Sequence, residues 1–215
     1  AEPVNHRRPG SEVELKAWLE NMAWHHRFST SEIEAATGLS TREITAALKR
    51  FGIRSDNRPP RRRGSPLKVL PYPGGRHPRI GFLDGAIRPQ RETKVSVFPP
   101  WEDASGDGPA DYFVVDVPEA IWSNLGLTYL AHTHIPTIWT SQGVALKKLE
   151  WNRRANGTFD IRRKLPNGIA FEARVEPKPD HVRMHLWLTN GTGETLTGLK
   201  VQNCVMLKGA RGFAR

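Results

Sequence analysis

From residue 67 onward, apolar and polar residues alternate with a period of two in one segment after another. Successive side chains of a strand point to opposite faces, so this alternation is typical of strands that bury one face. It predicts strands over residues 94–98, 112–117, 127–134, 145–151, 158–165, 169–175, 182–188 and 199–207, with a helix at 118–124. Short strands at this spacing, separated by turns such as Pro166-Asn167-Gly168, favour an antiparallel β-sandwich over residues 67–215.

The first fifty residues show a helical pattern instead. Ser11, Ser29 and Ser40 are each followed three residues later by Glu, a capping signature that marks the start of a helix. Gly38 and Gly52 stand where the second and third helices would end. We therefore expect a mainly β protein in which a small three-helix unit, residues 1–53, precedes the sheet domain.

Residues 54–66, RSDNRPPRRRGSP, show neither pattern. Proline and glycine interrupt regular structure here, and no apolar stripe is present. We predict a basic flexible linker. Its run of three arginines suits phosphate or an acidic polymer, although such a run is also typical of a solvated segment.

Composition limits the classes of protein to consider. The chain has 215 residues, a net charge of +10 and a single cysteine, so an internal disulfide framework and a cysteine-rich zinc site are excluded. No apolar run is long enough to span a membrane. Ala1-Glu2-Pro3 suits a mature terminus left by removal of an export signal, and removal of a tag would leave the same kind of terminus. We also expect the sheet domain to continue past Arg215, because a strand pattern ends just before it.

The second and third helices have the layout of a helix-turn-helix. The third helix would present an outer face that can approach DNA, made of Thr41, Arg42, Thr45 and Lys49. Glu32, Glu34 and Glu43 would repel phosphate, which favours a docking unit instead. A cytoplasmic DNA-binding regulator with a sandwich sensor domain is the alternative to export.

Two histidines and a loop are candidate ligand-binding groups in the sheet domain. His132 and His134 leave the same face of a strand, which suits one metal ion or a pair of sugar hydroxyls, with Asp116 or Glu119 as a third ligand. Bonding to neighbouring strands is the alternative. The loop system of residues 74–94 offers arginine forks and a carboxylate for a polyol or carboxylate ligand, or for a self-paired network: His77, Arg79, Asp84 and Arg91.

A polar stripe with one indole follows two neighbouring strands. Its members are Glu172, Arg174, Arg183, His185 and Trp187. An indole offers a flat apolar surface to a sugar ring while charged neighbours bond the hydroxyl groups. This stripe predicts a carbohydrate site, and a solvated sheet face is the alternative. No metal beyond the possible His132/His134 ion, and no other cofactor, is expected.

Two resemblances add to these predictions. The segments WLENMAWHHRFSTSEIEAATGLS, LPYPGGRHPRIGFLDGAIRPQRETKVSVF and VRMHLWLTNGTGETLTGLKVQNCVMLKGA resemble a family of predicted exported bacterial proteins, which implies export. Residues 182–205 resemble a strand–turn–strand segment of galactose mutarotase-like sandwiches, which implies a sandwich and a sugar isomerase. Gln202 and Cys204 stand where those enzymes carry a histidine signature.

The leading hypothesis is therefore an exported β-sandwich that binds a carbohydrate or a similar polar ligand. No nucleophile elbow, phosphate loop or HExxH motif is present, so these enzyme classes lack support, and a mutarotase-like isomerase is the enzyme alternative. A protein that docks a partner through a sheet edge or the basic linker is the remaining possibility. The oligomeric state is not predicted.

Overall fold

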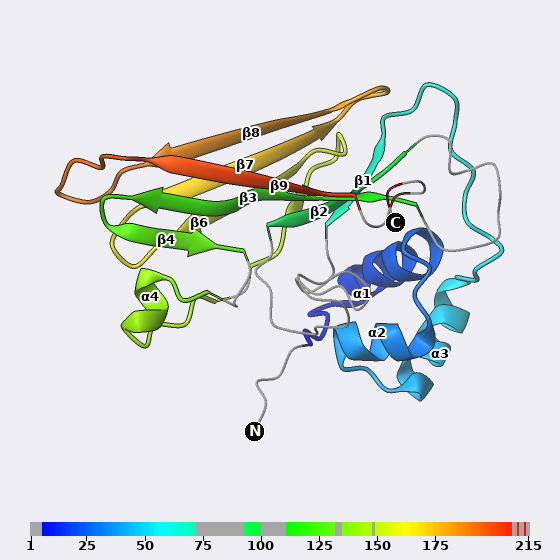
Figure 1. Cartoon of the computed structure of the whole chain (residues 1–215). Coiled ribbons are helices and arrows are strands. Elements are labelled where there is room, and N and C mark those ends of the chain that lie inside the picture. The colour runs from blue at the N-terminus through cyan, green and yellow to red at the C-terminus, as the bar shows by residue number, and fades with distance from the viewer. Residues whose placement is uncertain are drawn as a thin grey trace.

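The computed structural model describes residues 6–71, 93–99, 111–131, 135–147 and 149–207, with residues 210 and 213. Over these residues the protein is mainly strands, in antiparallel sheets, with short helices (Figure 1). Sheet A contains β1 (Lys68–Pro71), β2 (Lys94–Phe98), β3 (Phe113–Ser123), β4 (Gly126–Leu130) and β9 (Lys200–Met206). Sheet B contains β5 (Asn152–Arg153), β6 (Phe159–Lys164), β7 (Ala170–Pro177) and β8 (Val182–Thr189). The mainly β prediction is confirmed.

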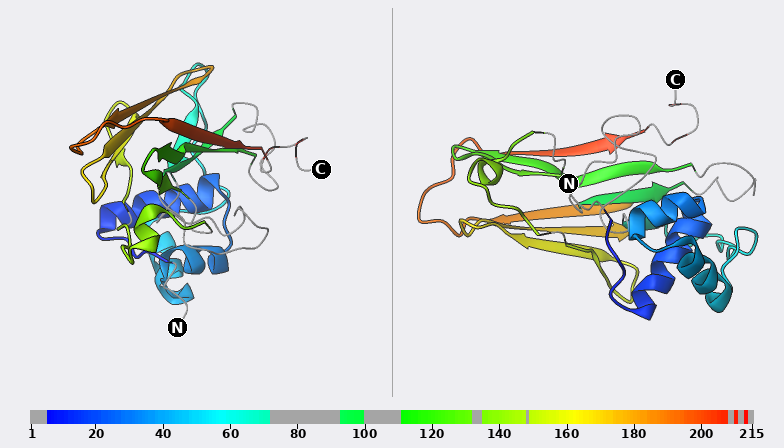
Figure 2. Two further views of the ribbon diagram at one scale, coloured as in Figure 1. Left: turned by 60° about the vertical axis from the view of Figure 1, so that its left-hand side comes forward. Right: turned by 90° about the horizontal axis from the view of Figure 1, so that it is seen from below.

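Strand β3 organises sheet A. Its first residues pair with β2 and its last residues with β4, while β9 pairs along the opposite edge of β3. Sheet B is a meander in which β6, β7 and β8 pair in chain order. Seen from below in Figure 2, the strands of sheet A lie beside those of sheet B and run along the same general direction.

Both sheets contribute to one apolar core. Alternate residues of β2 and β3 pack in a single cluster with alternate residues of β6 and β7: Val95, Val97, Val115, Val117, Phe159, Ile161, Ala173 and Val175. Glu172 and Arg174, between these positions on β7, are only partly buried. The period-two pattern therefore identified the buried face of β7. Burying each such apolar side chain contributes roughly 1.5–3 kcal/mol to the free energy of folding.

The helices begin near the serines that predicted them. Ser29 and Ser40 form reciprocal capping boxes at the starts of α2 (Thr30–Thr37) and α3 (Thr41–Phe51). At α1 (Glu12–Leu19), Ser11 accepts from the amide of Glu14, but the Glu14 carboxylate bonds the amide of Gly10 rather than that of Ser11. The chain then continues as a π-helical segment, η1 (Glu20–His25), which the sequence pattern did not predict.

The helices pack against sheet A through a buried histidine. His26 is fully buried, and its Nε2 lies 2.8 Å from Ser96 Oγ on β2. Its ring also contacts the rings of Phe98 and Tyr112, each with centroids 5.1 Å away. Asn21 extends the contact by donating to the carbonyl oxygen of Pro71 at 3.0 Å. The division of the chain into a three-helix unit, a linker and a sheet domain stays a prediction, but these contacts join the first helices to β1 and β2.

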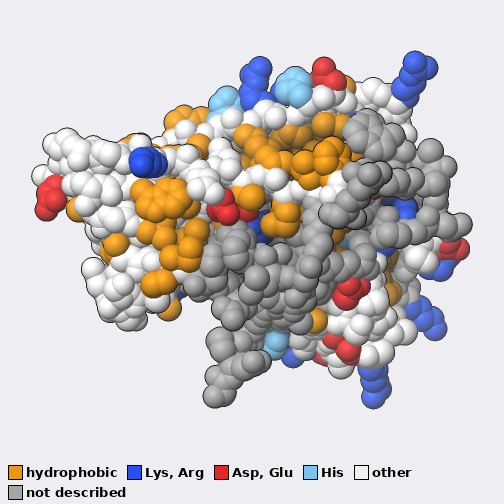
Figure 3. Space-filling model, in the orientation of Figure 1, with side chains coloured by type: hydrophobic (Ala, Val, Ile, Leu, Met, Phe, Trp, Pro, Cys, Tyr) orange, Lys and Arg blue, Asp and Glu red, His pale blue; other side chains and the backbone are white. Residues whose placement is uncertain are grey.

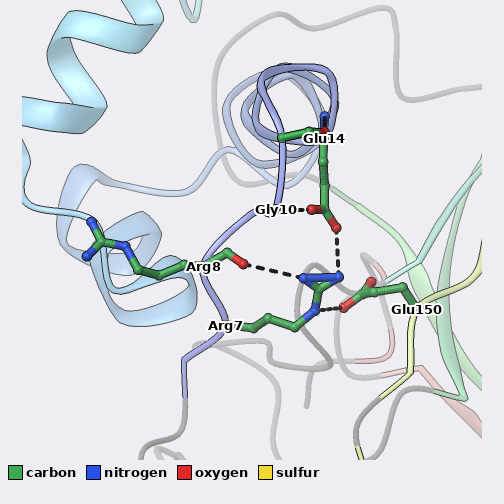
Figure 4. A network of polar contacts seen from close by, with 6 residues as sticks. Arg7, Arg8, Gly10, Glu14 and Glu150 are labelled. Atoms are coloured by element: carbon green, nitrogen blue, oxygen red, sulfur yellow. Dashed lines mark hydrogen bonds and ion pairs between the residues drawn. The ribbon is translucent and has the colours of Figure 1, made fainter.

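Arg7 forms a second connection between the helices and the later part of the chain (Figure 4). Its guanidinium bonds Glu14 of α1 at 2.7 Å and Glu150, which precedes β5, at 2.8 Å. The same group lies over the ring of Trp18, 4.8 Å from the centroid. One arginine thus connects the residues before α1, α1 itself and the segment that leads into sheet B.

Two local predictions were wrong, and one short helix was missed. Residues 118–123 continue strand β3 instead of forming the helix predicted over 118–124; Pro118 lies in the bulge between Asp116 and Ala120, where its missing amide interrupts no ladder bond to β9. The described residues of 145–151 form no strand. A short helix, α4 (Ile138–Ser141), was not predicted.

Strand β9 leaves apolar side chains in solvent. Leu199, Val201 and Val205 are 47%, 42% and 60% exposed. Figure 3 shows hydrophobic side chains gathered on the face of the molecule that β9 crosses. None of the helices in the described part of the chain has the length and apolarity that a bilayer crossing requires, in agreement with the sequence prediction.

Candidate functional site

The predicted polar stripe lies on one face of sheet B. Strand β7 contributes Glu172 and Arg174, strand β8 contributes Arg183, His185 and Trp187, and the register places Glu172 opposite Trp187 and Arg174 opposite His185. These positions alternate with core residues that are buried on β7 and partly buried on β8, so their side chains leave the face that points away from the core. We call these five residues the sheet B platform.

Three planar groups stack along the platform. The rings of His185 and Trp187 are nearly parallel, with an interplanar angle of 8° and centroids 5.5 Å apart. The Arg174 guanidinium lies 5.4 Å from the Trp187 ring centroid, within the range of a cation–π contact. Trp187 is nevertheless 44% exposed. Its indole is therefore held in one orientation while much of its surface stays open to solvent.

Carboxylates flank the planar groups. Arg174 lies 3.7 Å from Glu172, and His185 lies 4.0 Å from a carboxylate oxygen of Glu176. Glu176, which faces Arg183 in the register, was missed by the sequence prediction. The signal for it was present, because Glu176 continues the Glu172–Arg174 alternation by one more step. Acceptors and donors thus surround an exposed aromatic surface, which suits a ligand with hydroxyl groups on an apolar ring.

The predicted DNA-facing residues share the outer face of α3. Thr41, Arg42, Thr45 and Lys49 are all exposed there. Two acids lie in this region: Glu34 accepts a hydrogen bond from the Thr41 hydroxyl, and Glu43 pairs with Arg8 at 2.7 Å. The Ser40 amide and hydroxyl also bond Glu43 and lower its pKa. The surface therefore combines two exposed cations with two carboxylates.

A buried polar cluster joins β2, β3 and β9. Ligand atoms of Asp116, Glu119 and Cys204 lie within 4.8 Å of one another, a group of the kind that can hold a metal ion. The Lys94 ammonium pairs with Asp116, and Gln202 donates to Glu119 at 2.5 Å. A metal ion would have to compete with that ammonium, so the residues fit a structural ion pair better than a metal centre.

The ionisation of this cluster follows from its burial. Burial raises the pKa of Asp116, and the Lys94 charge opposes that rise. Burial also raises the pKa of the Cys204 thiol, and the charges of Glu119 and Asp116 add to the effect. The thiol is therefore protonated at neutral pH.

The other predicted site residues lie outside the described residues: His77, Arg79, Asp84, Arg91, His132 and His134. Of their suggested partners, Asp116 and Glu119 belong to the buried cluster. Comparisons of the chain with models of protein families, with curated proteins and with solved structures find no match. Support for a function therefore comes from the described side chains alone.

Proposed function

We propose that this protein is a β-sandwich that binds a carbohydrate or a similar polar ligand on the sheet B platform. The observation that carries the proposal is the exposed indole of Trp187, which is stacked against His185 and Arg174. The common core of the two sheets supports the sandwich architecture. The helices that contact sheet A are then a docking unit, and the exported location stays a prediction.

The chemistry of the platform matches such a ligand. A sugar ring presents C–H groups on one face, which pack on an indole, and hydroxyl groups at its edge. Glu172 and Glu176 accept from hydroxyl groups, while Arg174, Arg183 and His185 can donate to them. Because Trp187 already contacts its neighbours on the strand, little side-chain entropy is lost when a ligand binds.

Binding to an array of plant, algal and bacterial glycans tests this proposal. We expect the whole chain to bind a subset of the glycans, and Trp187→Ala to weaken that binding about tenfold or more, since a central aromatic residue commonly dominates binding energy. Val201→Ala is the matched control: Val201 is also an exposed apolar strand residue, at 42%, but it belongs to β9.

Two results would contradict the proposal. One is the absence of binding across the whole array. The other is binding that Trp187→Ala leaves unchanged, because the indole would then make no contact with the glycan. Urea unfolding of each variant checks that a loss of binding does not arise from a loss of fold.

A DNA-binding regulator is the second candidate, favoured by the shared exposure of Thr41, Arg42, Thr45 and Lys49 on α3. It predicts duplex binding that weakens steeply with salt, because Arg42 and Lys49 would contact phosphates. A gel shift that Arg42→Ala combined with Lys49→Ala leaves unchanged would remove this role for α3.

A further inference from the structure

A cavity of about 600 Å³ lies where η1, the basic segment (residues 54–66) and the turn between β5 and β6 meet. Trp24 and His25 of η1 form one side, residues 58–62 and 65–68 form a second, and Arg153 with Asn156 forms a third. In Figure 1 the basic segment is the cyan chain that runs from α3 up to β1. A cavity of this size is in the range that holds small ligands.

Among the described residues that line this cavity, basic side chains outnumber acidic ones. Glu20 is the acidic residue among them, and five are basic: Arg58, Arg61, Arg62, Lys68 and Arg153. A concave surface with one sign of charge and low-dielectric walls concentrates the electric field. Trp24, Phe98 and Phe159 supply apolar walls here. The cavity therefore attracts anions more strongly than an open surface with the same charges would.

Hydrogen bonds to the backbone near both ends of the basic segment hold this segment beside the cavity. The Trp24 indole donates to the carbonyl oxygen of Arg54 at 2.9 Å, and the amide of Leu67 donates to the carbonyl oxygen of Lys178 at 2.7 Å. Within the segment, Arg61 Nη2 bonds the Ser65 carbonyl oxygen at 2.5 Å. Arg61 Nη1 is buried and has no hydrogen-bond partner among the described residues. The Arg61 guanidinium is therefore fixed in the wall of the cavity.

The pKa of His25 reflects its burial and the positive charge around the cavity. Burial and the charges of Lys68, Arg58, His26 and Arg27 lower its pKa to about 3. At neutral pH the imidazole is therefore uncharged and offers a hydrogen bond inside a positively charged site. The same cations that suppress protonation of His25 would favour a bound anion.

We propose that this cavity binds a compact polyvalent oxyanion, whose phosphoryl or carboxylate groups are held by the arginine forks of Arg62 and Arg153, while Arg61 adds positive charge in the wall. Planar guanidinium groups bind both kinds of oxyanion in a bidentate manner. The site is separate from the sheet B platform and does not depend on the carbohydrate proposal.

Calorimetric titration of the whole chain with inorganic tripolyphosphate and with citrate, at constant ionic strength, tests the proposal. We expect binding of one or both, and weakening of about tenfold or more in Arg62→Gln combined with Arg153→Gln, because each lost contact is a charge-assisted hydrogen bond. Preference for tripolyphosphate identifies a phosphoryl ligand, and preference for citrate a carboxylate ligand.

A control with the same change of charge separates the cavity from the general attraction of a basic protein. Arg162→Gln combined with Lys164→Gln removes two exposed charges from β6, and we expect affinity to change less than about twofold. The proposal is overturned if neither anion binds at about 10 mM, a concentration that reveals even weak sites. It is also overturned if the two double variants lose the same affinity. Unchanged urea midpoints establish that both variants are folded.

Discussion

His26 and Ser96 form a buried polar contact across the boundary between the helices and sheet A: Nε2 and Oγ lie 2.8 Å apart. The other ring nitrogen, Nδ1, lies 2.5 Å from Asn21 Oδ1, so both polar atoms of a fully buried ring have partners. The stability of the helices and that of sheet A are consequently linked, because the partners of His26 come from both.

Ser96→Ala should therefore destabilise the whole chain. It leaves His26 Nε2 buried without its partner, which costs about 1–3 kcal/mol of unfolding free energy. Urea unfolding followed by circular dichroism measures this loss. Ser55→Ala, at an exposed position, is the control and should leave the midpoint unchanged. Equal midpoints for the two variants would show that the His26–Ser96 contact contributes nothing.

Arg7 and Glu150 should show measurable coupling. Their side chains are 27% and 24% exposed, so solvent screens the pair only partly. A double-mutant cycle with Arg7→Gln and Glu150→Gln should give about 0.5–1 kcal/mol at low salt and less at about 1 M salt. The same cycle on Arg54 and Asp56, 68% and 71% exposed, should give a value near zero. Equal coupling in the two cycles would contradict this ranking.

His25 should make stability depend on pH. Its pKa is about 3 in the folded chain, against 6.5 for the unperturbed group, so between these values the unfolded chain binds a proton that the folded chain does not. The contribution of His25 to the unfolding free energy is complete above pH 6.5 and is lost as the pH falls toward 3.

His25→Gln removes that proton uptake. The urea midpoint of the wild-type chain should fall more between pH 7 and pH 5 than the midpoint of this variant does. His181→Gln, at a histidine with a 55% exposed side chain, is the control for the substitution itself. Parallel pH profiles for all three proteins would show that His25 is protonated in the folded state.

Local patterns predicted local structure well. Alternation identified β6, β7 and β8 to within two residues, and the serines at positions 29 and 40 identified the starts of α2 and α3. Strand β3 past Pro118 was missed, in part because its pairing with β9 is a long-range property that the segment itself does not encode.

The same contrast between local pattern and tertiary structure applies to the two candidate sites. The sheet B platform was predicted because its residues follow from the period of two strands joined by one turn. The cationic cavity was not predicted, because Trp24, Arg62 and Arg153 come from three segments that only the tertiary structure brings together. The arginine run was noted, but its position opposite η1 and β5 was not accessible from the sequence.

Nuclear magnetic resonance of the indole N–H groups tests the central proposal most directly. The chain has seven tryptophans, and loss of one signal in Trp187→Phe assigns the platform indole. On titration with the tightest-binding glycan of the array, we expect the Trp187 signal to shift, while those of the buried Trp139 and Trp151 stay in place. A glycan that binds and shifts the Trp24 signal but leaves Trp187 unmoved would contradict a carbohydrate site on sheet B.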